Sequence, residues 1–122
     1  NNYYSVYSPL KFRQPPKHKI YKVAKSHNIY SKEINGNKAD EIFNLSKHMI
    51  KKIKKNNKPG FIELNTYRHF EHCGPNDDDN LKYRDIEITK KWKTRDPIKY
   101  FENKYYKFSD EFFKIKKKIN NF

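Results

Sequence analysis

The strongest constraint on the fold is an alternation of strand-like and helix-like segments along the chain. Residues 29–35 read as a short strand that ends at Gly36, and residues 61–67 read as a second strand. Between them, apolar residues repeat at helical spacing, which predicts a helix capped by Asn37. This apolar series is Ile42, Phe43, Leu45, Met49, Ile50 and Ile53. Strands that alternate with helices are typical of an α/β unit with parallel strands.

Helices are also expected on either side of these segments. Pro16 suits the first turn of a helix that includes residues 20–24. Further helices are expected over residues 85–93 and, after a break at Pro97, towards the C-terminus. Two short strands do not complete a parallel sheet, and no repeat or linker divides the chain. We therefore expect residues 1–122 to form a single, incomplete domain.

The composition allows a small core that is built mainly from aromatic side chains. Hydrophobic residues make up 34% of the chain and charged residues another 34%, which is close to disorder-prone compositions. The aromatic share of 16% argues against disorder, because Tyr and Phe bury a large area per residue.

The basic charge is interpreted mainly as a solvated lysine surface. The formal net charge is +14, which is compatible with an acidic partner such as nucleic acid. Arginine, the residue that best reads phosphates and bases, occurs only at Arg13, Arg68, Arg84 and Arg95. Nucleic acid is therefore an unexpected partner, although a basic, nonenzymatic nucleic-acid-binding or interaction module remains the alternative function.

The expected location is the cytoplasm. Cys73 is the only cysteine, so no intrachain disulfide can form and a reducing compartment is favoured. No apolar run approaches the length of a membrane span, and the N-terminus lacks the hydrophobic segment of a signal peptide.

An ordered series of residues resembles a known family. In the second half of the chain these are Pro59, Gly60, Glu63, Thr66, Tyr67, Arg68, His72, Asp78, Tyr83, Arg84, Glu87, Trp92, Asp96, Pro97 and Ile98. Upstream they are Asn1, Asn2, Tyr4 and Pro9, and the turn at Asn35, Gly36 and Asn37. The series resembles the C-terminal half of the alpha subunit of thiamine-diphosphate-dependent 2-oxo acid dehydrogenases of the pyruvate, branched-chain and acetoin type. The resemblance implies an α/β fold: a partial, Rossmann-like thiamine-diphosphate-binding domain with parallel strands, followed by C-terminal helices.

The resemblance also implies how the cofactor and its magnesium ion are held. In the family, the ion is bound by an aspartate of a Gly-Asp-Gly segment, by the second asparagine of a double-asparagine pair and by a nearby backbone carbonyl. Here Asn2 takes the asparagine role and the carbonyl of Tyr4 lies beside it, so both are expected to bind metal and cofactor. No Gly-Asp-Gly occurs in this chain, so the carboxylate ligand is expected from a missing N-terminal half. Read without the family, Asn1 and Asn2 form a frayed terminus.

A loop over residues 69–82 holds the remaining candidates. His72 matches the family's loop histidine, which reaches the cofactor diphosphate and the substrate carboxylate, so the resemblance implies a catalytic and cofactor-binding role. Arg68 and Arg84 match arginines that brace this loop. Read from the residues alone, His72 is an exposed loop histidine and the arginines form ordinary salt bridges with the acidic residues 77–79.

Other chemistry in this loop is weakly indicated. His69, His72 and Cys73 offer three possible zinc ligands, but no distant pair completes a tetrahedral site. The acidic run over residues 77–80 lacks the alternating spacing of a calcium loop. Cys73 stands where the family usually has a serine that is phosphorylated in some members, so kinase control at this site is not expected.

The resemblance finally implies an assembly and a reaction. The alpha subunit works with a beta subunit in a heterotetramer, and the beta subunit supplies the carboxylate that activates the cofactor. The substrate is a 2-oxo acid, which is decarboxylated before its acyl group passes to a lipoyl group. We expect this chain alone to be inactive, because it lacks both the Gly-Asp-Gly aspartate and the beta-subunit carboxylate.

Overall fold

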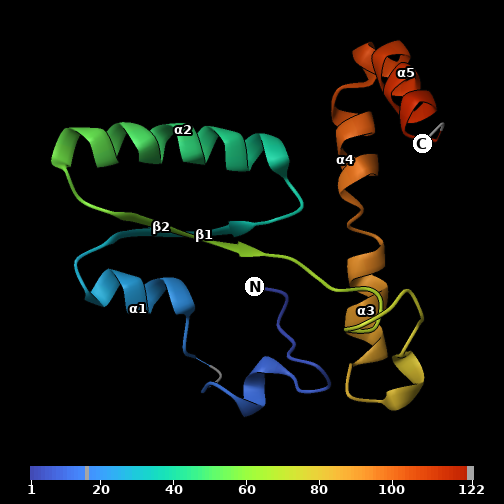
Figure 1. The fold of residues 1–122 in the computed structure, drawn as a ribbon, viewed down its shortest axis with the longest axis horizontal. Coiled ribbons are helices and arrows are strands. Elements are labelled where there is room, and N and C mark those ends of the chain that lie inside the picture. The colour runs from blue at the N-terminus through green and yellow to red at the C-terminus, as the bar shows by residue number, and fades with distance from the viewer. Residues whose placement is uncertain (16, 121–122) are drawn as a thin grey trace.

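The computed structural model describes residues 1–15 and 17–120 (Figure 1). In chain order the elements are η1 (Leu10–Phe12), α1 (Ile20–Ser26), β1 (Tyr30–Asn35), α2 (Ala39–Asn56), β2 (Gly60–Asn65), η2 (Asp79–Leu81), α3 (Ile86–Lys93), α4 (Pro97–Lys104), η3 (Tyr106–Phe108) and α5 (Ser109–Asn120). The order of helices and strands expected from the sequence is confirmed. The predicted role of Pro16 lies outside the described residues.

The strands β1 and β2 form a two-stranded parallel sheet, as their alternation with helices predicts. They pair in register, from Tyr30 opposite Gly60 to Asn35 opposite Asn65. The helices α1 and α2 cover opposite faces of this sheet (Figure 1). The arrangement is compatible with the expected α/β class. Both strands end at the same edge of the sheet, the edge nearest α3 (Figure 1).

The helix α2 approaches the sheet closely through Met49. This residue is only 3% exposed, and its side chain lies over Gly60, where an added Cβ would be 2.6 Å from the Met49 Sδ. The absence of a side chain at Gly60 therefore makes room for the helix. At the C-terminal end of α2, Asn57 adopts a left-handed conformation with φ of 50° and ends the helix. Lys54 and Lys55 lie in the last turn, where positive charge complements the helix dipole.

The start of α2 differs from the sequence prediction. The N-cap residue is Lys38, and it makes no side-chain cap hydrogen bond. The predicted cap, Asn37, instead donates from its side-chain amide to the carbonyl of Arg95 at 2.8 Å. A short polar side chain can satisfy either a local or a distant backbone group. The prediction of Asn37 as the cap is wrong because the tertiary contact with Arg95 takes its side chain.

The chain leaves β2 at Asn65 rather than at Tyr67 and enters the segment over residues 66–85, which we name the histidine loop. Tyr67 turns into an aromatic core, where its ring stacks on Trp92 with centroids 5.6 Å apart and an interplanar angle of 14°. Its hydroxyl lies 2.6 Å from the hydroxyl of Thr89, which is fully buried. This packing on α3 explains why the strand is shorter than its apolar pattern predicts.

The C-terminal helices begin at residues suited to that position. The side chain of Asp85 caps α3, and the side chain of Asp96 caps α4, which has Pro97 in its first turn. An ion pair between Lys104 and Asp40 ties α4 to α2. In the part of the chain that the structure describes, none of the helices is long and apolar enough to cross a bilayer.

Candidate cofactor site at the carboxyl ends of the strands

The segment over residues 1–4, which we name the asparagine segment, starts beside the end of β2. The amino nitrogen of Asn1 donates to the carbonyl of Leu64 at 2.9 Å, and the N–H of Thr66 donates to the carbonyl of Asn1 at 2.9 Å. Hydrogen bonds to the two residues that flank Asn65 are the pattern of a parallel neighbour. The segment therefore lies at the carboxyl edge of the sheet, where ligands of open α/β sheets bind.

Two asparagine side chains hold the backbone of this segment in a tight turn. The Asn1 Oδ1 accepts from the N–H of Tyr3 and the Asn2 Oδ1 accepts from the N–H of Tyr4, each at 3.1 Å. Tyr3 has a φ of 66°, which is unusual for a bulky residue. A hollow of about 370 Å³, lined in part by Asn2, Tyr4 and Glu63, lies next to the turn.

The asparagine segment fits part of a magnesium coordination sphere. An amide oxygen has two lone pairs, so the Asn2 Oδ1 keeps one after accepting from the N–H of Tyr4. The backbone carbonyl of Tyr4 is a second oxygen of the hard type that magnesium prefers. The nearby carboxylate of Glu63 is already bonded to Asn1 and to the backbone of Tyr21. A charged ligand for such an ion would have to come from outside these residues.

The ring of Tyr4 joins the asparagine segment to the histidine loop. It meets Tyr67 edge to face, with centroids 5.7 Å apart, and meets Tyr83 in the same way at 5.8 Å. Burial is the main cause that raises the pKa of the Tyr4 hydroxyl to about 12. The hydroxyl therefore stays protonated at neutral pH, and Tyr4 acts as a packing residue through its ring.

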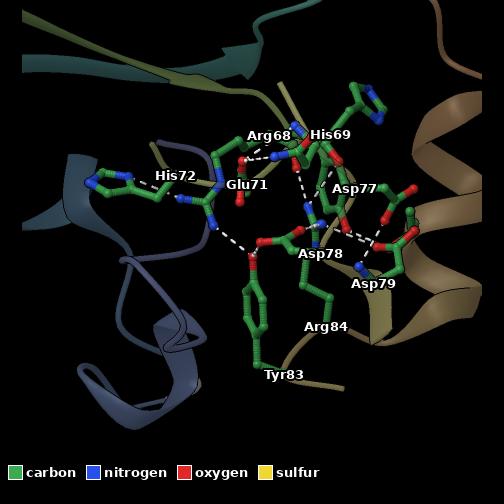
Figure 2. Close-up of polar contacts among 12 residues, drawn as sticks. Arg68, His69, Glu71, His72, Asp77, Asp78, Asp79, Tyr83 and Arg84 are labelled. Carbon is green, nitrogen blue, oxygen red and sulfur yellow. Dashed lines mark hydrogen bonds and ion pairs between the residues drawn. The ribbon is translucent and has the colours of Figure 1, made fainter. Parts of the chain in front are cut away.

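Arg84 holds the histidine loop closed (Figure 2). Its guanidinium pairs with the carboxylate of Asp78 and lies 3.2 Å from that of Asp79. It also donates to the carbonyls of Arg68 at 2.6 Å and His69 at 3.2 Å. Arg84 is 6% exposed and Asp78 is 3% exposed, so this ion pair is screened little by water. One buried side chain thus connects the two ends of the loop.

Arg68 connects the loop to the N-terminal segment and to His72. Its guanidinium donates to the carbonyl of Val6 and to the hydroxyl of Tyr83, both at 2.8 Å. It also lies 3.1 Å from the Nδ1 of His72 (Figure 2). Arginine has no acceptor, so this contact requires Nδ1 to accept, which in a neutral ring leaves the proton on Nε2. Because His72 is exposed, this N–H can reach a ligand that approaches the loop.

The structure gives no support to the zinc hypothesis. The described residues contain one cluster of potential metal ligands, formed by residues 77–79. Two of its carboxylates pair with Arg84, which satisfies their charge within the protein. His69, His72 and Cys73 do not form such a cluster in the described part of the chain.

Sequence reasoning assigned no role to Glu63 beside the asparagine segment. The residue is only 5% exposed, although its side chain is charged. A signal was present, because Glu63 interrupts the apolar run over residues 61–64. A charged residue in a buried strand needs specific partners.

The comparison with known proteins decides the family. A family model described as "Dehydrogenase E1 component" matches residues 1–109. The chain belongs to this family. A relative from Rickettsia bellii is 32% identical over 79 residues, which are 65% of this chain and 23% of the relative. A relative from Rickettsia typhi is 30% identical over 98 residues, which are 80% of this chain and 29% of the relative.

Both relatives are described as "Pyruvate dehydrogenase E1 component subunit alpha". These matches confirm that the E1 chain is similar to the alpha subunit of thiamine-diphosphate-dependent 2-oxo acid dehydrogenases. The chain spans about a quarter of the length of these curated relatives. No solved structure matches it.

Proposed function

We propose that this E1-family chain forms part of the alpha subunit of a thiamine-diphosphate-dependent 2-oxo acid dehydrogenase, with the asparagine segment on the metal side of the cofactor and His72 on the substrate side. The observation that carries the proposal is the position of Arg68, whose guanidinium contacts both Val6 and His72. Arg68 therefore joins two segments that are far apart in the sequence. When bound, thiamine diphosphate supplies the nucleophilic carbon and the electron sink for decarboxylation.

Asn2 and Tyr4 would hold the magnesium ion that accompanies the diphosphate. The Asn2 Oδ1 and the Tyr4 carbonyl offer two oxygen ligands from one tight turn. Two neutral oxygens bind magnesium weakly in competition with water, so a carboxylate is needed as well. We infer that a Gly-Asp-Gly aspartate outside this chain supplies it.

His72 would act as a hydrogen-bond donor to the cofactor diphosphate or to the substrate carboxylate. Arg68 occupies Nδ1, so a neutral ring would carry its proton on Nε2 and could donate it to the ligand. Arg84 supports this geometry from a distance, because it holds the carbonyls of Arg68 and His69. The two arginines are therefore positioning residues, and His72 is the residue that would touch the reacting groups.

The remaining parts of the enzyme would surround this chain. A Rossmann-like domain needs more strands than β1 and β2, and the unpaired edges of a sheet are normally paired, covered or blunted. We propose that the missing N-terminal half adds such strands and that a beta subunit completes the active site in a cytoplasmic heterotetramer. The substrate would be a 2-oxo acid, decarboxylated before acyl transfer to a lipoyl group.

Replacing His72 in the assembled enzyme tests this function. His72→Ala should lower the rate of acyl transfer about 100-fold, the lower range for loss of a proton-transfer or donor group. Thermal stability should hardly change because the side chain is exposed. The matched control is His27→Ala, an exposed histidine at the end of α1. Full activity of His72→Ala, or an equal loss in the control, would contradict the assignment.

A further inference from the structure

The carboxylate of Glu63 lies where β2, the asparagine segment and α1 meet. One oxygen, Oε1, accepts from the Asn1 Nδ2 at 2.6 Å. The other, Oε2, accepts from the backbone N–H of Tyr21 in the first turn of α1 at 2.9 Å. The residue is 5% exposed. Both oxygens are thus committed to donors that belong to different segments, in a place that water hardly reaches.

The bond to Glu63 determines the orientation of the Asn1 side chain. The Nδ2 of Asn1 donates to Glu63, while its Oδ1 accepts from the N–H of Tyr3. If the amide rotated by half a turn, a donor would face the N–H of Tyr3 and an acceptor would face the carboxylate. An acceptor-only carboxylate at Glu63 therefore allows one orientation of Asn1. That orientation holds the backbone on both sides of Asn2, including the left-handed Tyr3.

Glu33 provides a contrast within the same sheet. It is the register partner of Glu63 on β1, but it accepts from Lys19 at 3.0 Å and from Asn65 at 2.7 Å. In the described part of the chain, no residue of the asparagine segment donates a hydrogen bond to Glu33. Two neighbouring glutamates thus differ in one respect that matters here, namely contact with Asn1.

We infer that Glu63 is a positioning residue, which fixes Asn1 and thereby presents the Asn2 Oδ1 to the metal ion. The effect on metal binding rests on the proposed function, whereas the fixed geometry of the asparagine segment is a property of this chain alone. A glutamine at position 63 keeps the shape of the glutamate side chain but cannot accept hydrogen bonds at both of its ends. Its amide nitrogen would face a donor, either the Nδ2 of Asn1 or the N–H of Tyr21.

The test compares Glu63→Gln with Glu33→Gln and with the double variant Asn1→Asp plus Glu63→Gln. The double variant reverses the direction of the hydrogen bond, because the glutamine nitrogen can donate to the new aspartate while its oxygen still accepts from Tyr21. The alpha subunit that carries this chain, assembled with its beta subunit, is measured in two ways. One is hydrogen exchange at the amides of Tyr3 and Tyr4. The other is the magnesium concentration that gives half-maximal thiamine diphosphate binding.

Glu63→Gln is expected to speed exchange at both amides about tenfold and to raise the half-saturating magnesium concentration by a similar factor, as for one lost buried hydrogen bond. Glu33→Gln should leave both values within about twofold of the parent, and the double variant should recover most of both losses. Asn1→Ala removes the donor but leaves the bond to Tyr21, so it should reproduce the effect of Glu63→Gln with less loss of stability.

Unchanged exchange at Tyr3 and Tyr4 in Glu63→Gln would overturn the positioning role, whatever the cofactor does. A lower melting temperature with an unchanged magnesium dependence would likewise reduce Glu63 to a structural residue. If the parent assembly binds no thiamine diphosphate, the proposed function fails. The exchange measurement then still decides whether Glu63 fixes the asparagine segment.

Discussion

Replacing Arg84 with Met should strongly destabilise the protein. Asp78 is 3% exposed and pairs with Arg84, so the substitution leaves a buried carboxylate without its counter-charge. Breaking a buried ion pair in this way costs about 3–5 kcal/mol. The carbonyls of Arg68 and His69 also lose a donor. Because a folded domain is stable by only about 5–15 kcal/mol, the loss is a large part of the total.

Urea unfolding of the alpha subunit measures this loss. Arg95→Met is the matched control, since the Arg95 side chain is exposed and lies 5.1 Å over the ring of Trp92. It should cost about 1 kcal/mol or less. The double variant Arg84→Met with Asp78→Leu should recover most of the stability, because it removes the uncompensated charge. A loss below about 1 kcal/mol for Arg84→Met would refute the view that this buried pair holds the loop.

Three further outcomes are expected. The pKa of Tyr4 is raised from 10.0 to about 12 in the folded protein, so the folded state binds this proton more tightly than the unfolded state. The free energy of unfolding should therefore fall as pH rises from 10 to about 12. Melting temperatures measured from pH 9 to 12 should fall less steeply in Tyr4→Phe than in the parent. Gly60→Ala places a Cβ 2.6 Å from the Met49 Sδ and should cost about 1–3 kcal/mol by chemical denaturation, and no loss would contradict the packing of α2. Binding to DNA should be indifferent to sequence and should disappear at moderate salt, as titrations by fluorescence anisotropy would show; selective binding at physiological salt would favour the basic binding module.

Much of the fold could be predicted because its signals are local. The helical repeat that contains Met49 and the extended run after Pro59 each identify their own element, and their alternation indicates parallel strands. The boundaries were less predictable, because they depend on distant partners. Asn37 has the features of a cap, but its amide bonds to Arg95. Tyr67 continues the apolar pattern of β2, but it stacks on Trp92.

The candidate site was only partly visible in the sequence. The family resemblance indicated His72, Arg68 and Arg84, and a loop rich in polar groups between a strand and a helix is a usual place for function. The sequence could not show that Arg68 bonds to the carbonyl of Val6, since a backbone acceptor carries no residue-specific signal. The role of Glu63 depends in the same way on two donors distant in sequence.

The most direct test of the central claim is the magnesium dependence of thiamine diphosphate binding to the assembled alpha and beta subunits. We expect the parent enzyme to bind the cofactor in a magnesium-dependent manner. Asn2→Ala should raise the half-saturating magnesium concentration about tenfold or more, because it removes an oxygen ligand. Asn44→Ala, at an exposed position of α2, should leave it unchanged. Cofactor binding that does not require magnesium, or a dependence that Asn2→Ala does not alter, would contradict the account.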